Sequence, residues 1–87
     1  MSGTRSEERK AESTRFSEQL GIRLRDMREA HKVSQTEMGL RIGFSKTHIS
    51  NCELGKTMIS AEILYRYCKE FDVSVDKVFS AIKLDDK

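Results

Sequence analysis

Residues 34–56 contain two short helix signals with a glycine between them, and this spacing constrains the fold more than any other stretch of the 87-residue chain. Ser34 and, three residues later, Glu37 form a capping box, which predicts the start of a helix. Gly43 predicts its end, because glycine readily adopts the left-handed conformation that terminates helices. Ser45 predicts the cap of a second helix, which closes at the next glycine. Two short capped helices joined by a tight turn are typical of a helix-turn-helix.

The inner faces of these two helices are apolar. Met38 and Ile42 share one side of the first helix, and Ile49 and Cys52 share one side of the second. Gly39 lies in the middle of the first helix, where glycine costs about 1 kcal/mol relative to alanine. We therefore expect another helix to approach Gly39 closely.

The outer face of the second helix carries hydroxyl, amide and ammonium groups, which hydrogen-bond base edges and phosphates. The candidate base-reading residues are Lys46, Thr47, Ser50 and Asn51, with Ser45 at the tip of the helix. A solvated surface helix is the alternative, because any surface helix is polar outside. The caps and the small residues of the turn favour a helix that reads DNA.

The segment from Leu20 to Phe79 resembles the lambda-repressor/Cro-type helix-turn-helix family, also called XRE-like. The matching blocks are LGIRLRDMREAHKVSQTEMGLRIGFS, then Ile49 with Ser50, Glu53, Gly55 and Lys56, then Ser60 through FDVSVDKVF. The resemblance implies an all-α domain of five helices, whose third helix reads DNA in the major groove. It departs from the family at Gly39, where alanine is usual.

The resemblance also implies roles for single residues. Arg28 matches a helix-one arginine that forms an internal ion pair with the glutamate that is Glu53 here. Gln35 matches a phosphate-contacting position at the start of the second helix, and Lys56 is well placed for a phosphate just past the third. We expect phosphate contacts from Gln35, Ser45 and Lys56. For Arg28, the alternative is an ordinary surface charge. For Arg25, we expect a solvated position on the surface of the first helix.

We expect the folded domain over residues 16–82, with its first helix capped by Ser17. A short polar tail, residues 83–87, follows it. Residues 1–15 lack any large apolar side chain, which favours a flexible tail. An extension of the first helix is one alternative. The other is a DNA-binding arm built on Arg5, Arg9, Lys10 and Arg15.

In this family the last helix and its neighbouring loop often form a symmetric dimer. The candidate interface residues here are Val75, Val78, Phe79 and Ile82. Closure of the core is the alternative, and for Val78 and Phe79 both functions are compatible. A two-fold dimer would place two reading helices about one DNA turn apart on a palindromic site.

Catalysis is not expected, since the sequence has no Gly-rich phosphate loop, no metal-ligand spacing and no nucleophile–base pair. We expect neither a cofactor nor a metal, and the lack of a long apolar run excludes a transmembrane helix. Cys52 and Cys68 fall in apolar helical patterns and are interpreted as core residues of a cytoplasmic protein. The basic excess lies in residues 1–60, with 11 basic and 8 acidic side chains against 5 and 6 in residues 61–87.

The sequence therefore predicts a sequence-specific DNA-binding transcriptional regulator, of the repressor type, that binds double-stranded DNA as a homodimer on a palindromic operator. The alternative is a helix-turn-helix module that binds a protein partner, antitoxin-like or anti-regulator. Leu40, Tyr65 and the apolar residues near the C-terminus motivate this alternative.

Overall fold

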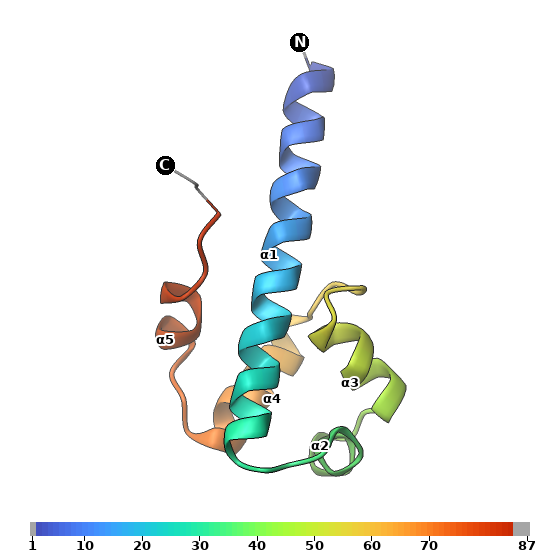
Figure 1. The fold of residues 1–87 in the computed structure, drawn as a ribbon, viewed down its shortest axis with the longest axis vertical. Coiled ribbons are helices and arrows are strands. Elements are labelled where there is room, and N and C mark those ends of the chain that lie inside the picture. Colours follow the sequence, from blue (N-terminus) through green and yellow to red (C-terminus); the bar gives the residue numbers. More distant parts are fainter. Residues whose placement is uncertain (1, 85–87) are drawn as a thin grey trace.

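Five helices make up the described part of the chain in the computed structural model, which covers the backbone of residues 2–84 and the side chains of residues 6–84. They are α1 (Ser2–Ala30), α2 (Gln35–Ile42), α3 (Lys46–Glu53), α4 (Ala61–Phe71) and α5 (Val75–Ser80) (Figure 1). The predicted all-α fold with five helices is confirmed. The Arg5 side chain of the expected arm, Met1, and residues 85–87 of the expected C-terminal tail lie outside the described residues.

Each of the four shorter helices begins with a serine cap. In every case the serine hydroxyl accepts the backbone N–H three residues on, at 3.0–3.2 Å; the caps are Ser34, Ser45, Ser60 and Ser74. These bonds satisfy one of the donors that a helix leaves unpaired at its start. Only half of the expected capping box forms, because the Glu37 carboxylate accepts instead from Arg41 Nε at 3.1 Å.

Helix α1 is longer than the sequence pattern predicted. The expected flexible tail is helical from Ser2, and Ser17, the expected cap, is buried inside the helix with its Oγ 4.0 Å from the sulfur of Met58. The first half of α1 projects beyond the packed helices (Figure 1). Extending an existing helix adds one backbone hydrogen bond per residue without a new nucleus, so a polar segment can continue a helix that packing has already started.

The core lies where α1 meets α3, α4 and α5, with α2 packed against α3. The side chains with almost no exposed surface are Leu24, Met38, Ile49, Cys52, Ile63 and Tyr67. Both cysteines are buried free thiols, and burial raises the pKa of each thiol. Cys52 and Cys68 are therefore uncharged core residues at neutral pH, in line with the sequence interpretation.

Gly21 and Gly39 are two of the glycines that another part of the backbone approaches closely. A Cβ added at Gly21 would lie 2.5 Å from the carbonyl oxygen of Glu53 and 2.7 Å from that of Cys52, so α1 packs directly on the end of α3. A Cβ at Gly39 would collide with the carbonyl oxygen of Phe44, in the turn between α2 and α3. The expectation that another helix approaches Gly39 was wrong, because the turn of the same motif occupies that space.

No helix among residues 2–84 has the length and apolar character needed to cross a membrane. The same described residues contain no group of three or more His, Cys, Asp or Glu side chains placed to hold a metal ion.

Candidate nucleic-acid interface

The turn before α3 is held by backbone hydrogen bonds. The N–H groups of Gly43 and Phe44 both donate to the carbonyl oxygen of Gly39, at 2.8 and 3.0 Å, and Gly43 has a φ of 84°. The Phe44 ring packs against the core and stacks on His48, with ring centroids 5.3 Å apart. This arrangement fixes the direction in which α3 leaves α2.

Helix α3 is buried on one side and accessible on the other. Its buried side carries Ile49 and Cys52, which both belong to the core. The four expected base-reading residues all keep solvent access: Lys46 and Thr47 are exposed, whereas Ser50 and Asn51 are half-buried. His48 is half-buried and engaged with its neighbours, because besides stacking on Phe44 its Nε2 lies 3.8 Å from Cys52 Sγ.

A groove of about 450 Å³ opens between α1, the start of α2 and α3. It is lined by Arg25, Arg28, Ser34, Gln35, Thr36, Lys46, Ser50, Glu53 and Leu54. The groove thus brings Gln35, from the expected phosphate contacts, together with Lys46 and Ser50 from the expected base-reading set. Ser45 and Lys56 are exposed but lie outside the lining of the groove.

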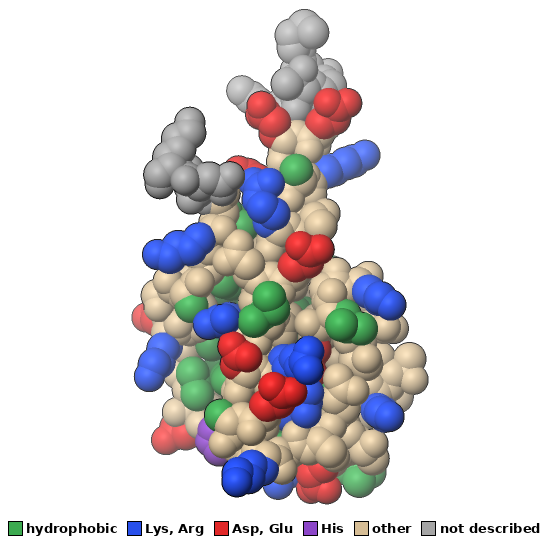
Figure 2. Space-filling model, in the orientation of Figure 1, with side chains coloured by type: hydrophobic (Ala, Val, Ile, Leu, Met, Phe, Trp, Pro, Cys, Tyr) green, Lys and Arg blue, Asp and Glu red, His purple; other side chains and the backbone are tan. Residues whose placement is uncertain are grey.

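Charged side chains of both signs are interspersed over the face of the molecule drawn in Figure 2, rather than gathered into regions of one sign. This agrees with the small formal net charge of +2 for the whole chain. Attraction of a polyanion to this domain therefore depends on particular cationic side chains at the interface more than on a broad field.

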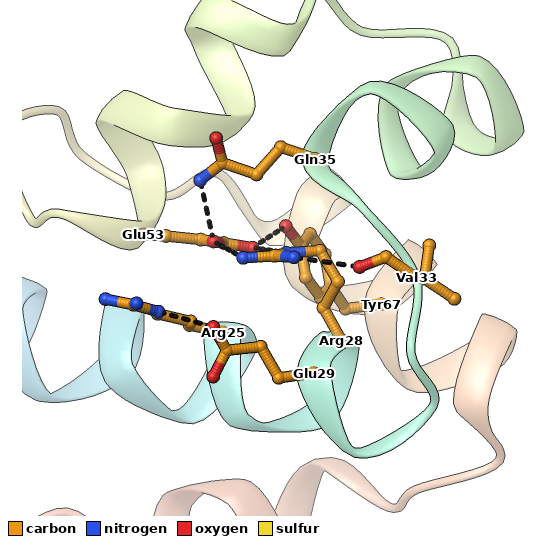
Figure 3. A network of polar contacts seen from close by, with 7 residues as sticks. All are labelled: Arg25, Arg28, Glu29, Val33, Gln35, Glu53 and Tyr67. Atoms are coloured by element: carbon orange, nitrogen blue, oxygen red, sulfur yellow. Dashed lines mark hydrogen bonds and ion pairs between the residues drawn. The ribbon is translucent and has the colours of Figure 1, made fainter.

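A buried polar network lies beneath the groove and joins four helices (Figure 3). Arg28 donates from Nε and Nη2 to the two carboxylate oxygens of Glu53, both at 2.8 Å. Its Nη1 donates to the carbonyl oxygen of Val33 at 2.8 Å. The Glu53 carboxylate also accepts from the Tyr67 hydroxyl at 2.7 Å and from Gln35 Nε2 at 3.1 Å. The structure therefore brings Arg28 and Glu53 together and adds two further donors to the pair.

The hydrogen bonds of this network keep both charges in place despite their burial. Burial by itself would raise the pKa of Glu53, but the donors Arg28, Tyr67 and Gln35 outweigh it and hold that pKa below its usual range. The hydrogen bond to Glu53 raises the pKa of Arg28. Burial and the bond to Glu53 together raise the pKa of Tyr67, so its hydroxyl stays protonated and remains a donor.

Gln35 and Tyr67 have roles that the sequence argument did not assign. The Gln35 amide that was expected at a phosphate donates to Glu53, and the second N–H of that amide is left for another acceptor. Tyr67 offered one signal in the sequence, since a tyrosine within an apolar helical stripe needs a buried partner for its hydroxyl. The sequence does not say which acceptor that is.

The expected dimer residues divide into two kinds. Val78 is 4% exposed and belongs to the core of the single chain. Val75 and Phe79 remain exposed, and Ile82 is half-buried. Phe79 and Ile82 line an apolar groove together with Phe16 and Leu84, and the rings of Phe16 and Phe79 have centroids 6.2 Å apart. A surface built on Val75, Phe79 and Ile82 is thus accessible, whereas Val78 is not.

Comparison with known proteins gives a consistent result. Residues 21–83 match a family model described as a helix-turn-helix domain. A protein of Pyrococcus abyssi (strain GE5 / Orsay), named as an HTH-type transcriptional regulatory protein, is 32% identical over 63 residues, covering 72% of this chain and 20% of that protein. The antitoxin PezA of Streptococcus pneumoniae serotype 4 is 29% identical over 55 residues, covering 63% of this chain and 35% of PezA. The match spans about a fifth of the first relative and about a third of the second.

Proposed function

Because this chain belongs to the helix-turn-helix domain family, we propose that it is a sequence-specific DNA-binding regulator of transcription. The proposal rests on the two different sides of α3. One side of this helix is anchored in the core through Ile49 and Cys52, and the other side presents accessible polar groups. A helix held rigidly from behind can carry hydrogen-bonding side chains into the major groove, which is wide enough to admit it.

The proposed contacts fall into two classes. Lys46, Thr47, Ser50 and Asn51 supply the donors and acceptors that distinguish base pairs in the major groove. Gln35, Ser45 and Lys56 contact phosphates, which fix the position of the protein on the duplex without specifying sequence. Arg28 and Glu53 contribute indirectly, because their ion pair ties the end of α3 to α1.

We propose that the protein acts as a repressor and binds a palindromic operator as a homodimer. The exposed Val75 and Phe79 and the half-buried Ile82 supply apolar surface for a second copy. A two-fold dimer presents two copies of α3 to half-sites about one helical turn apart. Where such a site overlaps a promoter, occupying it excludes the polymerase, so repression needs no surface beyond the DNA-binding and dimer surfaces.

Selection from a random duplex library, repeated across a series of salt concentrations, tests the proposal. We expect an enriched palindrome whose half-site centres lie about 10 base pairs apart. Salt-sensitive binding without an enriched sequence would reduce the protein to a non-specific DNA binder. Absence of binding to any duplex, even at low salt, would overturn the proposed function.

Replacing Thr47 and Ser50 together by alanine tests the assignment of base contacts. Because one hydroxyl hydrogen bond contributes about 0.5–1.5 kcal/mol and two are removed, we expect preference for the selected site to fall by about tenfold, with non-specific affinity nearly unchanged. The matched control replaces Thr14 and Ser80, two exposed hydroxyl residues outside α3, by alanine. An equal loss of affinity on all sequences would contradict the assignment.

A second candidate function, binding of a protein partner, is favoured by two observations. The chain is similar to PezA, which is named as an antitoxin. Leu40 and Tyr65 are exposed apolar side chains, with 77% and 56% of their surface accessible. A partner that co-purifies in fixed stoichiometry, together with no DNA affinity at low salt, would favour this function over DNA binding.

A further inference from the structure

We propose that Arg25 is an additional phosphate contact of the DNA-binding face and that Glu29 holds its guanidinium in place until a phosphate replaces the carboxylate. The inference rests on the proposed DNA-binding function and extends it. The sequence pattern placed Arg25 on an ordinary solvated face of α1. The structure instead places it on the wall of the groove that also holds Gln35 and Lys46.

Arg25 lies at the edge of the groove and is accessible to a ligand. Its side chain remains 55% accessible, and Figure 3 shows it beside the Arg28–Glu53 pair that forms the floor of the groove. The opposite walls come from the first turn of α2 and from α3. A phosphate that contacts Gln35 therefore lies over the same groove that Arg25 borders.

The accessible charge of the groove is positive. Its lining contains the three basic side chains of Arg25, Arg28 and Lys46, and a single carboxylate, that of Glu53. Glu53 is already neutralised by Arg28 and is buried. The accessible charges on the walls are therefore both positive. The backbone N–H groups of Gln35 and Thr36, in the first turn of α2, add to the preference for an anion.

Arg25 forms a local ion pair with Glu29. Arg25 Nε lies 3.0 Å from Glu29 Oε2 one helical turn away, and both side chains are more than half exposed. Exposed ion pairs of this spacing are weak, so a phosphate can displace the carboxylate. The planar guanidinium then matches two phosphate oxygens at once. In the absence of DNA, Glu29 orients the Arg25 side chain. The negative charge of Glu29 also weakens binding of the polyanion.

Helix α1 provides a matched control in Arg23. Its Nη2 lies 3.2 Å from Asp26 Oδ2, so it too belongs to a local ion pair with an exposed carboxylate. The two arginines are two positions apart, which places them about 200° apart around the helix. Arg23 borders a different, apolar groove that includes Met27, Val73 and Val78. A phosphate held at the α2–α3 groove cannot reach it.

The experiment measures binding of the full chain to a duplex of unselected sequence across a salt series, for the wild type, Arg25→Gln and Arg23→Gln. For Arg25→Gln we expect the slope of log K against log salt to fall in magnitude by about one per bound subunit, with about a tenfold loss of affinity per contact near 0.1 M salt. Arg23→Gln should retain the wild-type slope. Thermal unfolding of each variant checks that the fold is intact.

A second pair of variants tests the role of Glu29. Glu29→Gln should tighten binding, because it removes the competing carboxylate, whereas Asp26→Asn should leave binding unchanged. Equal slopes for Arg25→Gln and Arg23→Gln, in a wild type that binds DNA, would overturn this inference alone. A wild type that binds no duplex at low salt would overturn the proposed function as well.

Discussion

At the scale of single residues, the most consequential side chain is Glu53. It is the last residue of α3, and its carboxylate receives hydrogen bonds from α1, α2 and α4. A buried charge is tolerated only when its partners fill its hydrogen-bonding capacity, as they do here. The orientation of the proposed reading helix thus depends on one buried carboxylate, which forms part of the groove that Lys46 and Ser50 also line.

Replacing Glu53 by glutamine should destabilise the domain strongly. The amide keeps the shape of the side chain but removes the negative charge, so the guanidinium of Arg28 stays buried without a counter-charge. Breaking a buried pair in this way typically costs about 3–5 kcal/mol. Denaturant unfolding at pH 7 measures the loss. The matched control is Glu62→Gln, which alters an exposed ion pair with Arg66 and removes a charge from the first turn of α4, and should change stability by about 1 kcal/mol or less.

A comparison of the wild type with Glu53→Gln should also depend on pH. The pKa of Glu53 is lower in the folded chain than in the unfolded chain, so its contribution is complete above the unfolded value of about 4.3 and is lost as pH falls through the folded value. The stability difference between the wild type and Glu53→Gln should therefore be constant above about pH 5 and shrink at more acidic pH. A difference that is independent of pH down to acid unfolding would show that Glu53 does not carry the charge.

At the scale of helices, α1 is the element against which α3, α4 and α5 pack, and Gly21 sets how closely α3 approaches it. The carbonyl groups at the end of α3 occupy the space where a side chain on residue 21 would begin. These are the carbonyls of Cys52 and Glu53, beside the buried ion pair. Close contact at Gly21 and the hydrogen bonds of Glu53 therefore fix the same end of the reading helix.

Replacing Gly21 by alanine tests this close approach through the sign of the effect. Helix propensity alone would stabilise the variant by about 1 kcal/mol. A methyl group facing fixed backbone atoms forces α1 and α3 apart, and overpacking of this kind costs about 1–3 kcal/mol. We expect net destabilisation in thermal unfolding. Ala11→Gly, at an exposed position of α1, calibrates the propensity term, and a stabilised Gly21→Ala would contradict the observed packing.

The starts of the four shorter helices were predictable from the sequence because each depends on a local bond. Ser34, Ser45, Ser60 and Ser74 each cap a helix within three residues, so the signal and the structure lie in the same short stretch. The first half of α1 was not predictable in this way. It has no apolar periodicity, and its helical state follows from the packed segment next to it.

Contacts between residues far apart in the sequence could not be predicted from local patterns. The ion pair of Arg28 and Glu53 was predicted from a resemblance to a family, not from the spacing of the two residues. The hydrogen bonds from Tyr67 and Gln35, and the position of Arg25 on the groove, depend on how helices are oriented in three dimensions. No local pattern encodes such an orientation.

At the scale of the whole molecule, α3 and α5 lie on opposite sides of α1 (Figure 1). The proposed DNA-reading surface and the proposed dimer surface are therefore separate, and neither blocks the other. The spacing of two reading helices in a dimer would then be set by the rigid body between these surfaces. Dimerisation becomes a separable property that a single substitution in α5 can remove.

Replacing Val75 by aspartate should abolish the proposed dimer without weakening the folded subunit. Val75 is the first residue of α5 and is 36% exposed, and an acidic side chain in the first turn of a helix is favourable for the helix dipole. The same carboxylate placed in an apolar interface would be buried without a partner, which is costly. Sedimentation equilibrium should show a dimer for the wild type and a monomer for Val75→Asp. The thermal stability of the variant should equal that of the wild type at concentrations too low for dimerisation. Tyr65→Asp, at an exposed aromatic residue on α4, is the control and should leave the dimer intact. A wild type that is monomeric at concentrations well above those that saturate a palindromic duplex would contradict the proposed mode of binding, because cooperative occupancy of two half-sites requires the two subunits to be joined.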